Sequence, residues 1–276
     1  MFNWSLKLKK QTKFISPVGP RFESAPWKNL YISDTHIKIK VPKHRTALPT
    51  ESIDTNHACN LHNLHDKLYE KNGIRLRACV LTLREWDFYG PWFTGRMGAI
   101  TMSITIESPA DISEGLNFFH PRALEAGITN FLTQRYSNHF SVVNSEQMWL
   151  APMNWKIIKD LPCIGVCFNA SNIDVQFNGH GPDYYLAVPI SKHHFVMICC
   201  RISRATVFTD IQPEPTVDEW IDHKPFITLI NQVLDSVQVT LSPEAQADQE
   251  AALQGLEDKS LVKEFPPIKW TKQSGR

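Results

Sequence analysis

Several features that are common in chains of this length are missing here, and each absence narrows the possible functions. No stretch of the 276 residues approaches the roughly 20 apolar residues that a membrane-spanning helix needs. The 29 Lys and Arg residues nearly balance the 28 Asp and Glu residues, which gives a formal net charge of +1. Such a balance provides no strong field to attract a nucleic-acid backbone or an anionic membrane. We therefore expect neither as a partner.

The sequence also lacks the short motifs that mark common catalytic and nucleotide-binding sites. It contains no G-x-G-x-x-G, no G-x-x-x-x-G-K-[ST] and no G-x-S-x-G. The first two place glycines where the backbone must approach phosphates, and the third exposes a catalytic serine on a sharp turn. The motifs thus indicate no cofactor and no hydrolase site.

The cysteines are too few and too badly placed for a disulfide framework. There are six in the whole chain. Cys199 and Cys200 are adjacent in a predicted strand, so they point to opposite faces. Cys163 and Cys167 are separated by roughly 13 Å of strand, whereas a disulfide needs Cα atoms within about 7 Å. The N-terminal residues MFNWSLKLKK alternate like a strand and lack the apolar run of a signal peptide. We therefore expect reduced, mostly buried thiols in a soluble cytoplasmic protein.

Period-two alternation of apolar and polar residues is the dominant pattern in the chain. It runs through HIKIKVP from His36, GIRLRACVLTLREW from Gly73, and AITMSITIES from Ala99. The last two runs flank an aromatic turn, which predicts an antiparallel hairpin. Further short runs predict a meandering antiparallel sheet, and they lie near 146–151, 154–159, 163–169, 172–178, 183–190 and 193–203.

Three helices are predicted around these strands. The first begins near Pro121 and carries apolar residues at helical spacing up to Leu132. The second has a capping box at Thr216 and Glu219, restarts at Pro225 and continues to Val237. The third begins at the N-cap Ser242 and stops near Gly255. We predict an α+β fold in which helices cover a large, mainly antiparallel sheet. Residues 1–241 form one domain, and 242–276 form a helix and extended arm that packs weakly or reaches a partner.

This order of elements resembles that of the PsbP-like and DcrB-like sandwich proteins. In that group an antiparallel sheet carries a C-terminal helix reading roughly F-x-x-L-x-x-x-L-x-S, and the matching stretch here is FITLINQVLDSVQV, Phe226 to Val239. The resemblance implies a mostly non-enzymatic accessory, chaperone-like or adaptor role. It implies no site residues, because the group shares no catalytic motif.

The stretch HACNLHNLHD, residues 57–66, is the one candidate metal site. If residues 52–71 form a helix, Cys59, His62, His65 and Asp66 supply sulfur, nitrogen and carboxylate ligands of the kind that zinc prefers. One straight helix rarely closes a tetrahedral shell, and the partners that could complete it cannot be placed: His120, His139, His180, His193 and His194. The alternative is a solvated, histidine-rich helix face.

Aromatic residues mark two further places. The turn from Arg84 to Gly95 contains Trp86, Phe88, Tyr89, Trp92 and Phe93, which form either a binding surface or the closed end of the core. A second concentration includes Phe140, Met148 and Trp149, and we assign it mainly to strand core. His180 and Asp183 lie in a turn and could form an acid–base pair, although turn chemistry explains them equally well.

Together these features predict a non-catalytic protein that binds another protein, in the manner of an adaptor, an accessory chaperone or an immunity protein. Two alternatives remain. The first is a carrier of small apolar ligands, in which the sheet and helices enclose an aromatic-lined pocket. The second is a metal-dependent enzyme centred on Cys59, His62, His65 and Asp66.

Overall fold

A long antiparallel hairpin forms the middle of the fold, as the alternating runs predict. The computed structural model of the chain describes residues 15–47, 50–54, 58–63, 67–71, 73–91, 95–141, 145–173, 180–204 and 221–271. The hairpin consists of β5 (Ile74–Tyr89) and β6 (Arg96–Pro109), paired antiparallel along most of their length. Both faces of this hairpin are available for packing, and other elements of the fold cover each face.

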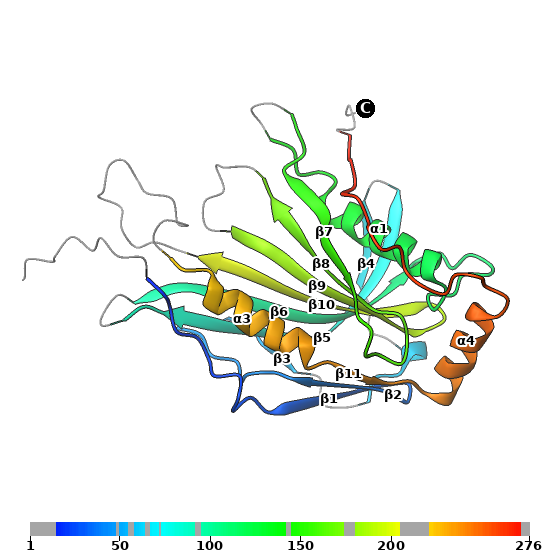
Figure 1. The fold of residues 1–276 in the computed structure, drawn as a ribbon, viewed down its shortest axis with the longest axis horizontal. Helices are drawn as coiled ribbons and strands as arrows, with labels where there is room; N and C mark the ends of the chain where they lie inside the picture. Colours follow the sequence, from blue (N-terminus) through cyan, green and yellow to red (C-terminus); the bar gives the residue numbers. More distant parts are fainter. Residues whose placement is uncertain are drawn as a thin grey trace, which may run out of the picture.

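The hairpin belongs to an eight-stranded sheet in which every described pair of strands is antiparallel. The strand order is β3-β5-β6-β10-β9-β8-β7, and β4 also pairs with β5. Figure 1 shows these strands fanning out with the twist expected of a large sheet. The remaining strands are β3 (Ile53–Asp54), β4 (Lys67–Lys71), β7 (Trp149–Ile157), β8 (Val166–Asn172), β9 (His180–Ser191) and β10 (His194–Arg204).

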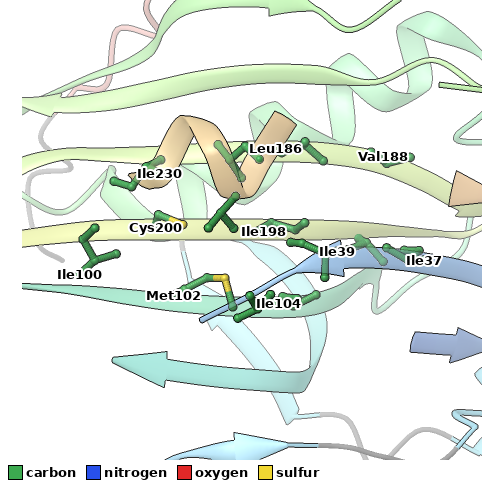
Figure 2. Close-up of a cluster of buried hydrophobic side chains, with 14 of the residues drawn as sticks. Ile37, Ile39, Ile100, Met102, Ile104, Leu186, Val188, Ile198, Cys200 and Ile230 are labelled. Carbon is green, nitrogen blue, oxygen red and sulfur yellow. The ribbon is translucent and has the colours of Figure 1, made fainter. Parts of the chain in front are cut away.

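A second, three-stranded sheet and one helix cover the first face of the large sheet. The small sheet has the order β1-β2-β11, formed by Trp27–Ile32, Thr35–Lys40 and Gln238–Thr240. Helix α3 (Lys224–Asp235) lies across the same face (Figure 1). Figure 2 shows how side chains from both layers meet there: Ile37 and Ile39 of β2, Ile100, Met102 and Ile104 of β6, Leu186 and Val188 of β9, Ile198 and Cys200 of β10, and Ile230 of α3.

Helix α1 (Pro121–Tyr136) and the C-terminal arm cover the second face. Pro121 occupies the first helical turn, and the His120 side chain accepts a hydrogen bond from the backbone N–H of Arg122, so the predicted start is confirmed. The apolar stripe of α1 packs on strand residues that point away from α3. Cys199 lies in this second core and Cys200 lies in the first, which confirms that the two thiols point to opposite faces.

The C-terminal segment consists of a helix and an arm, each with one buried residue in the described structure. Helix α4 (Pro243–Leu253) begins at the N-cap Ser242 as predicted, and Ala245 is its one buried residue. The arm then passes α1 and β7 (Figure 1), where Leu261 is buried. The Trp155 indole N–H donates to the carbonyl of Val262 at 2.9 Å, and the N–H of Ile268 donates to that of Ala151 at 2.7 Å. The arm is therefore joined to the body of the protein by backbone and side-chain hydrogen bonds.

The predicted helix over residues 52–71 is wrong. Its described parts are β3, a short 3-10 helix at Leu61–Asn63, and β4. Both strands add to β5, and the backbone of Cys59 bonds to Tyr31 and Ser33 of the small sheet. Pairing with β5 outweighs the helical spacing of the leucines, because local propensity is only a weak preference.

Most of the other predicted elements have counterparts in the structure, with shifted ends, whereas the predicted strand at 172–178 lies outside the described residues from position 174 onward. The runs at 146–151 and 154–159 form the single strand β7, and the runs at 183–190 and 193–203 form β9 and β10. The α+β class and the large antiparallel sheet are confirmed. The predicted N-terminal strand and the capping box at Thr216 and Glu219 lie outside the described residues.

The packing of α3 gives a first prediction. Ile230 is fully buried between α3 and the sheet, whereas Ile173 is 47% exposed. Ile230→Ala leaves a cavity, so we expect its free energy of unfolding to fall by about 2–5 kcal/mol. The matched Ile173→Ala change should cost at most about 0.5 kcal/mol. Urea denaturation of both variants measures this, and equal losses would contradict the assignment of α3 to the core.

Candidate functional site

The predicted metal ligands are not brought together by the described structure. Cys59 is half-buried beside the small sheet and His62 is exposed in the 3-10 helix, while His65 and Asp66 lie outside the described residues. Burial raises the pKa of the Cys59 thiol, against a hydrogen bond with Cys79. In the part of the chain that is described, no three His, Cys, Asp or Glu side chains are grouped to hold a metal ion. The helix that was to align these ligands does not form.

The described aromatic side chains of the predicted turn differ in burial, since some lie in the core and one is half-buried. Trp86 and Phe88 are 0% and 1% exposed, so the prediction that they form a binding surface is wrong. Residues two apart on a strand share a face, and this face packs against α3, where Phe88 stacks on Phe226 at 4.1 Å between ring centroids. Tyr89 is half-buried, and Trp92 and Phe93 lie outside the described residues.

A buried polar cluster lies under the last turn of α1, on the second face of the sheet. The hydroxyls of Tyr136 and Tyr185 donate to Asp183 Oδ2 at 2.6 and 3.3 Å, and they also contact each other. Asp183 and Tyr185 share a face because they are two residues apart on β9. Tyr136 comes from α1 and closes the cluster from above. All three residues are buried, so the hydroxyls satisfy a carboxylate that would otherwise be costly to bury.

Two arginines approach the same carboxylate oxygen. Arg201 stands opposite Asp183 in the pairing of β10 with β9, and its Nε lies 3.4 Å from Asp183 Oδ2. Arg135, in the last turn of α1, places Nη2 at 3.9 Å from that oxygen and stacks over the rings of Phe131 and Tyr136. We call Arg135, Tyr136, Asp183, Tyr185 and Arg201 the Asp183 cluster.

A second carboxyl group lies deeper on the same face. Glu107 of β6 is buried and accepts a hydrogen bond from the Thr105 hydroxyl at 2.7 Å. Burial raises the pKa of Glu107 to about 7, although the Thr105 hydrogen bond and the positive charge of Arg135 both lower it. Its charge therefore changes close to neutral pH, within the electrostatic reach of Arg135.

Four members of the Asp183 cluster, all except the fully buried Tyr185, line a cavity of about 680 Å³. Phe140, Met148 and Trp149 add apolar surface to the lining, and the Trp149 indole stacks on the Tyr136 ring at 4.5 Å between centroids. We call this space the Trp149 cavity. Its lining consists of Arg135, Tyr136, Asn138, His139, Phe140, Met148, Trp149, Asn172, Asp183 and Arg201. A volume of this size with an apolar wall and a few converging polar groups is typical of small-molecule sites.

A second cavity, of about 540 Å³, contains two of the histidines that the sequence left unplaced. His62, His193 and His194 line it, together with Glu244 and Asp248 from α4. Burial and the charge of Lys192 lower the pKa of His193, against the charge of Asp248. The mixed charges and the sparse apolar lining make this cavity the weaker candidate for a ligand site.

Sequence reasoning found only part of the Trp149 cavity. Asp183 was proposed as an acid–base partner of His180, but its carboxylate is held by two tyrosines and two arginines. Trp149, Met148 and Phe140 were assigned to strand core, yet each is only half-buried and lines the cavity. Arg135 and Arg201 were missed, because only the strand register and the end of α1 bring them together.

Comparisons with models of protein families, with curated proteins and with solved structures find no match to this chain. Among the described residues, no helix combines the length and the apolar character needed to cross a membrane. All six cysteines carry free thiols, three of them buried, so the prediction that they form no disulfide is confirmed.

Glu107 gives a prediction for the pH dependence of stability. Its pKa rises from an ordinary value near 4.5 to about 7 on folding, so between these pH values the folded state keeps a proton that the unfolded state releases. Stability must therefore fall as the pH rises through this window. Glu107→Gln cannot ionise, so its free energy of unfolding relative to the wild type should increase by roughly 3 kcal/mol between pH 4.5 and 8.

Urea unfolding at several pH values measures this difference. Glu114→Gln, at an exposed turn position, accounts for the general effect of removing one carboxylate. A difference between Glu107→Gln and the wild type that stays constant with pH would show that Glu107 is ionised in the folded protein throughout the range.

Proposed function

We propose that the protein binds a small amphipathic molecule in the Trp149 cavity. The observation that carries this proposal is the pairing of a half-buried aromatic wall with a preformed, hydrogen-bonded charged wall around one concave space. Small-molecule sites combine apolar contact for affinity with a few fixed polar groups for orientation. Of the functions considered from the sequence, the ligand carrier fits this arrangement best.

The groups around the cavity are suited to holding a ligand near neutral pH. Burial above all, with the charge of Asp183, raises the pKa of Tyr136 and Tyr185 well above that of a free phenol, so both hydroxyls stay protonated and act as donors. The Asp183 carboxylate is engaged by these donors and by Arg201. The cytoplasmic location expected from the sequence is part of this proposal. So is the resemblance to the PsbP-like and DcrB-like group, whose members are mostly non-enzymatic.

Binding of the neutral fluorescent probe N-phenyl-1-naphthylamine tests the proposal. We expect saturable binding to the wild type and at least about tenfold weaker binding to Trp149→Leu, the loss of one aromatic contact being worth about 1.4 kcal/mol or more. Trp27→Leu is the matched control, because Trp27 lies on the outer face of the small sheet and does not line the cavity. The absence of saturable binding, or equal affinities for the two variants, would refute a ligand site at Trp149.

A second candidate function is the binding of another protein through the outer face of the small sheet. Trp27 and Tyr31 of β1 are 43% and 51% exposed there, far more than most of the aromatic residues that the structure describes. The Lys38 ammonium lies 4.6 Å from the centre of the Trp27 ring, and the His36 ring stacks on Tyr31. Exposed aromatic residues beside cationic ones are enriched at protein interfaces, and they would suit an acidic partner surface.

Pull-down from a native lysate tests this second function. We expect a stoichiometric partner that is retained by Trp149→Leu and lost by the double variant Trp27→Ala, Tyr31→Ala, with stronger capture at low salt. If the double variant still captures the partner, or if the wild type captures no partner, the small sheet is not the contact surface.

A further inference from the structure

The charges around the Trp149 cavity do not cancel. Two of its lining residues, Arg135 and Arg201, are cationic, and Asp183 is the only acidic residue among the described residues that line it. Both guanidinium groups approach Asp183 Oδ2, so one carboxylate serves two cations. The tyrosine hydroxyls donate to the same oxygen, which further disperses its negative charge. The lining thus carries one more guanidinium group than carboxylate, and Glu107, which interacts with Arg135 from the same face, offsets part of this excess when it ionises.

The two guanidinium groups still have hydrogen-bonding capacity toward the cavity. Within the described structure, the Arg201 guanidinium pairs only with Asp183, and the contact is made through Nε. Its two terminal nitrogens carry four further N–H donors, and 49% of the side chain is exposed. The Arg135 guanidinium lies over the rings of Phe131 and Tyr136, at 6.0 and 5.7 Å from their centroids, and these contacts favour its position at the cavity.

We propose that the cavity recognises an aromatic carboxylate, with the carboxylate bound by Arg201 and Arg135 and the ring held against Trp149. This inference rests on the ligand-binding function proposed above and specifies the chemistry of the ligand. Arginine presents paired N–H groups that match the two oxygens of a carboxylate. The Trp149 indole and the Met148 side chain supply a wall on which a planar ring can pack.

The same arrangement disfavours cationic ligands. A ligand ammonium group would need Asp183, but that carboxylate is already shared by two arginines and two hydroxyls. It would also meet the positive charge of the guanidinium groups, which outnumber the carboxylate in the lining. A neutral ligand of the same shape would gain the apolar contact and lose the charge-assisted hydrogen bonds, which are roughly twice as strong as neutral ones.

Three naphthalene compounds of similar shape separate these contributions. Titration calorimetry at low salt would compare 2-naphthoate, the neutral 2-naphthamide and the cationic 2-naphthylmethylammonium. We expect 2-naphthoate to bind at least tenfold more tightly than the amide, and the cation to bind most weakly. Arg201→Gln should weaken the binding of 2-naphthoate at least tenfold, and it should change the affinity for the amide by less than threefold.

Arg21→Gln is the matched control, because it removes the same charge from an exposed arginine that does not line the cavity. It should leave both affinities unchanged. Arg201→Lys keeps the charge and loses the paired geometry, so it should recover only part of the affinity for 2-naphthoate. The urea midpoint of each variant, compared with that of the wild type, separates a loss of ligand contacts from a loss of folding.

The outcomes distinguish this inference from the function on which it rests. If N-phenyl-1-naphthylamine binds in a Trp149-dependent way but 2-naphthoate and 2-naphthamide bind equally, the cavity is a ligand site without anion recognition and the inference is wrong. If 2-naphthoate is preferred but Arg201→Gln and Arg21→Gln change its affinity equally, the assignment of Arg201 to the ligand carboxylate is wrong. If none of the probes binds, both proposals fall.

Discussion

The pairing of β10 with β6 on one side and β9 on the other determines which side chains belong to each core. Along these strands one set of residues packs against α3 and the small sheet, and the alternate set packs against α1 and the C-terminal arm. The neighbours Cys199 and Cys200 therefore belong to different cores. A register slip of one residue would turn each set of side chains toward the opposite face, so that neither set would meet the layer it packs against. The register of this pairing is therefore strongly specified.

The same register creates the polar site. Arg201 meets Asp183 because the two are paired residues on β10 and β9, and Tyr185 joins them from the next position on the same face. Buried polar groups are tolerated when every member has a partner, and they then favour one arrangement over others. Tyr136 completes the cluster only because α1 ends above it, so the helix position and the strand register must agree. The Trp149 cavity lies where these two constraints meet.

The elements that sequence reasoning predicted correctly are those whose local pattern and final environment agree. Ile100, Met102 and Ile104 alternate and all face one core, and Ser242 with Pro243 begins a helix by local capping chemistry. Residues 52–71 have helical spacing but supply strands to β5. For β4 a local signal exists, because Lys71 pairs with Ile74 and the Asn-Gly sequence between them favours a tight hairpin, whereas the pairing of β3 with Thr82 and Leu83 has no local signal.

The candidate site depends even more on long-range geometry. Trp149 was visible as part of an aromatic concentration, but its position in a cavity wall follows from stacking on Tyr136. Arg135 and Arg201 are 66 positions apart in the chain, and each taken alone is an ordinary surface arginine. Their shared carboxylate becomes apparent only when the α1 terminus and the β9–β10 register are both known. Neither the position of the α1 terminus nor the β9–β10 register can be inferred from the composition or periodicity of a single sequence.

The two edges of the large sheet differ in how they are protected from other chains. At β7 the C-terminal arm supplies the N–H of Ile268 to Ala151 and the carbonyl of Val262 to Trp155, so this edge is partly covered by the protein itself. At β4, Leu68 and Tyr69 are exposed between the charged side chains of Lys67 and Glu70. Unpaired strand edges are the usual starting points of self-association, and flanking charges restrain it. Because Lys67 and Glu70 carry opposite charges, they provide little repulsion between two copies, and β4 is the less protected of these two edges.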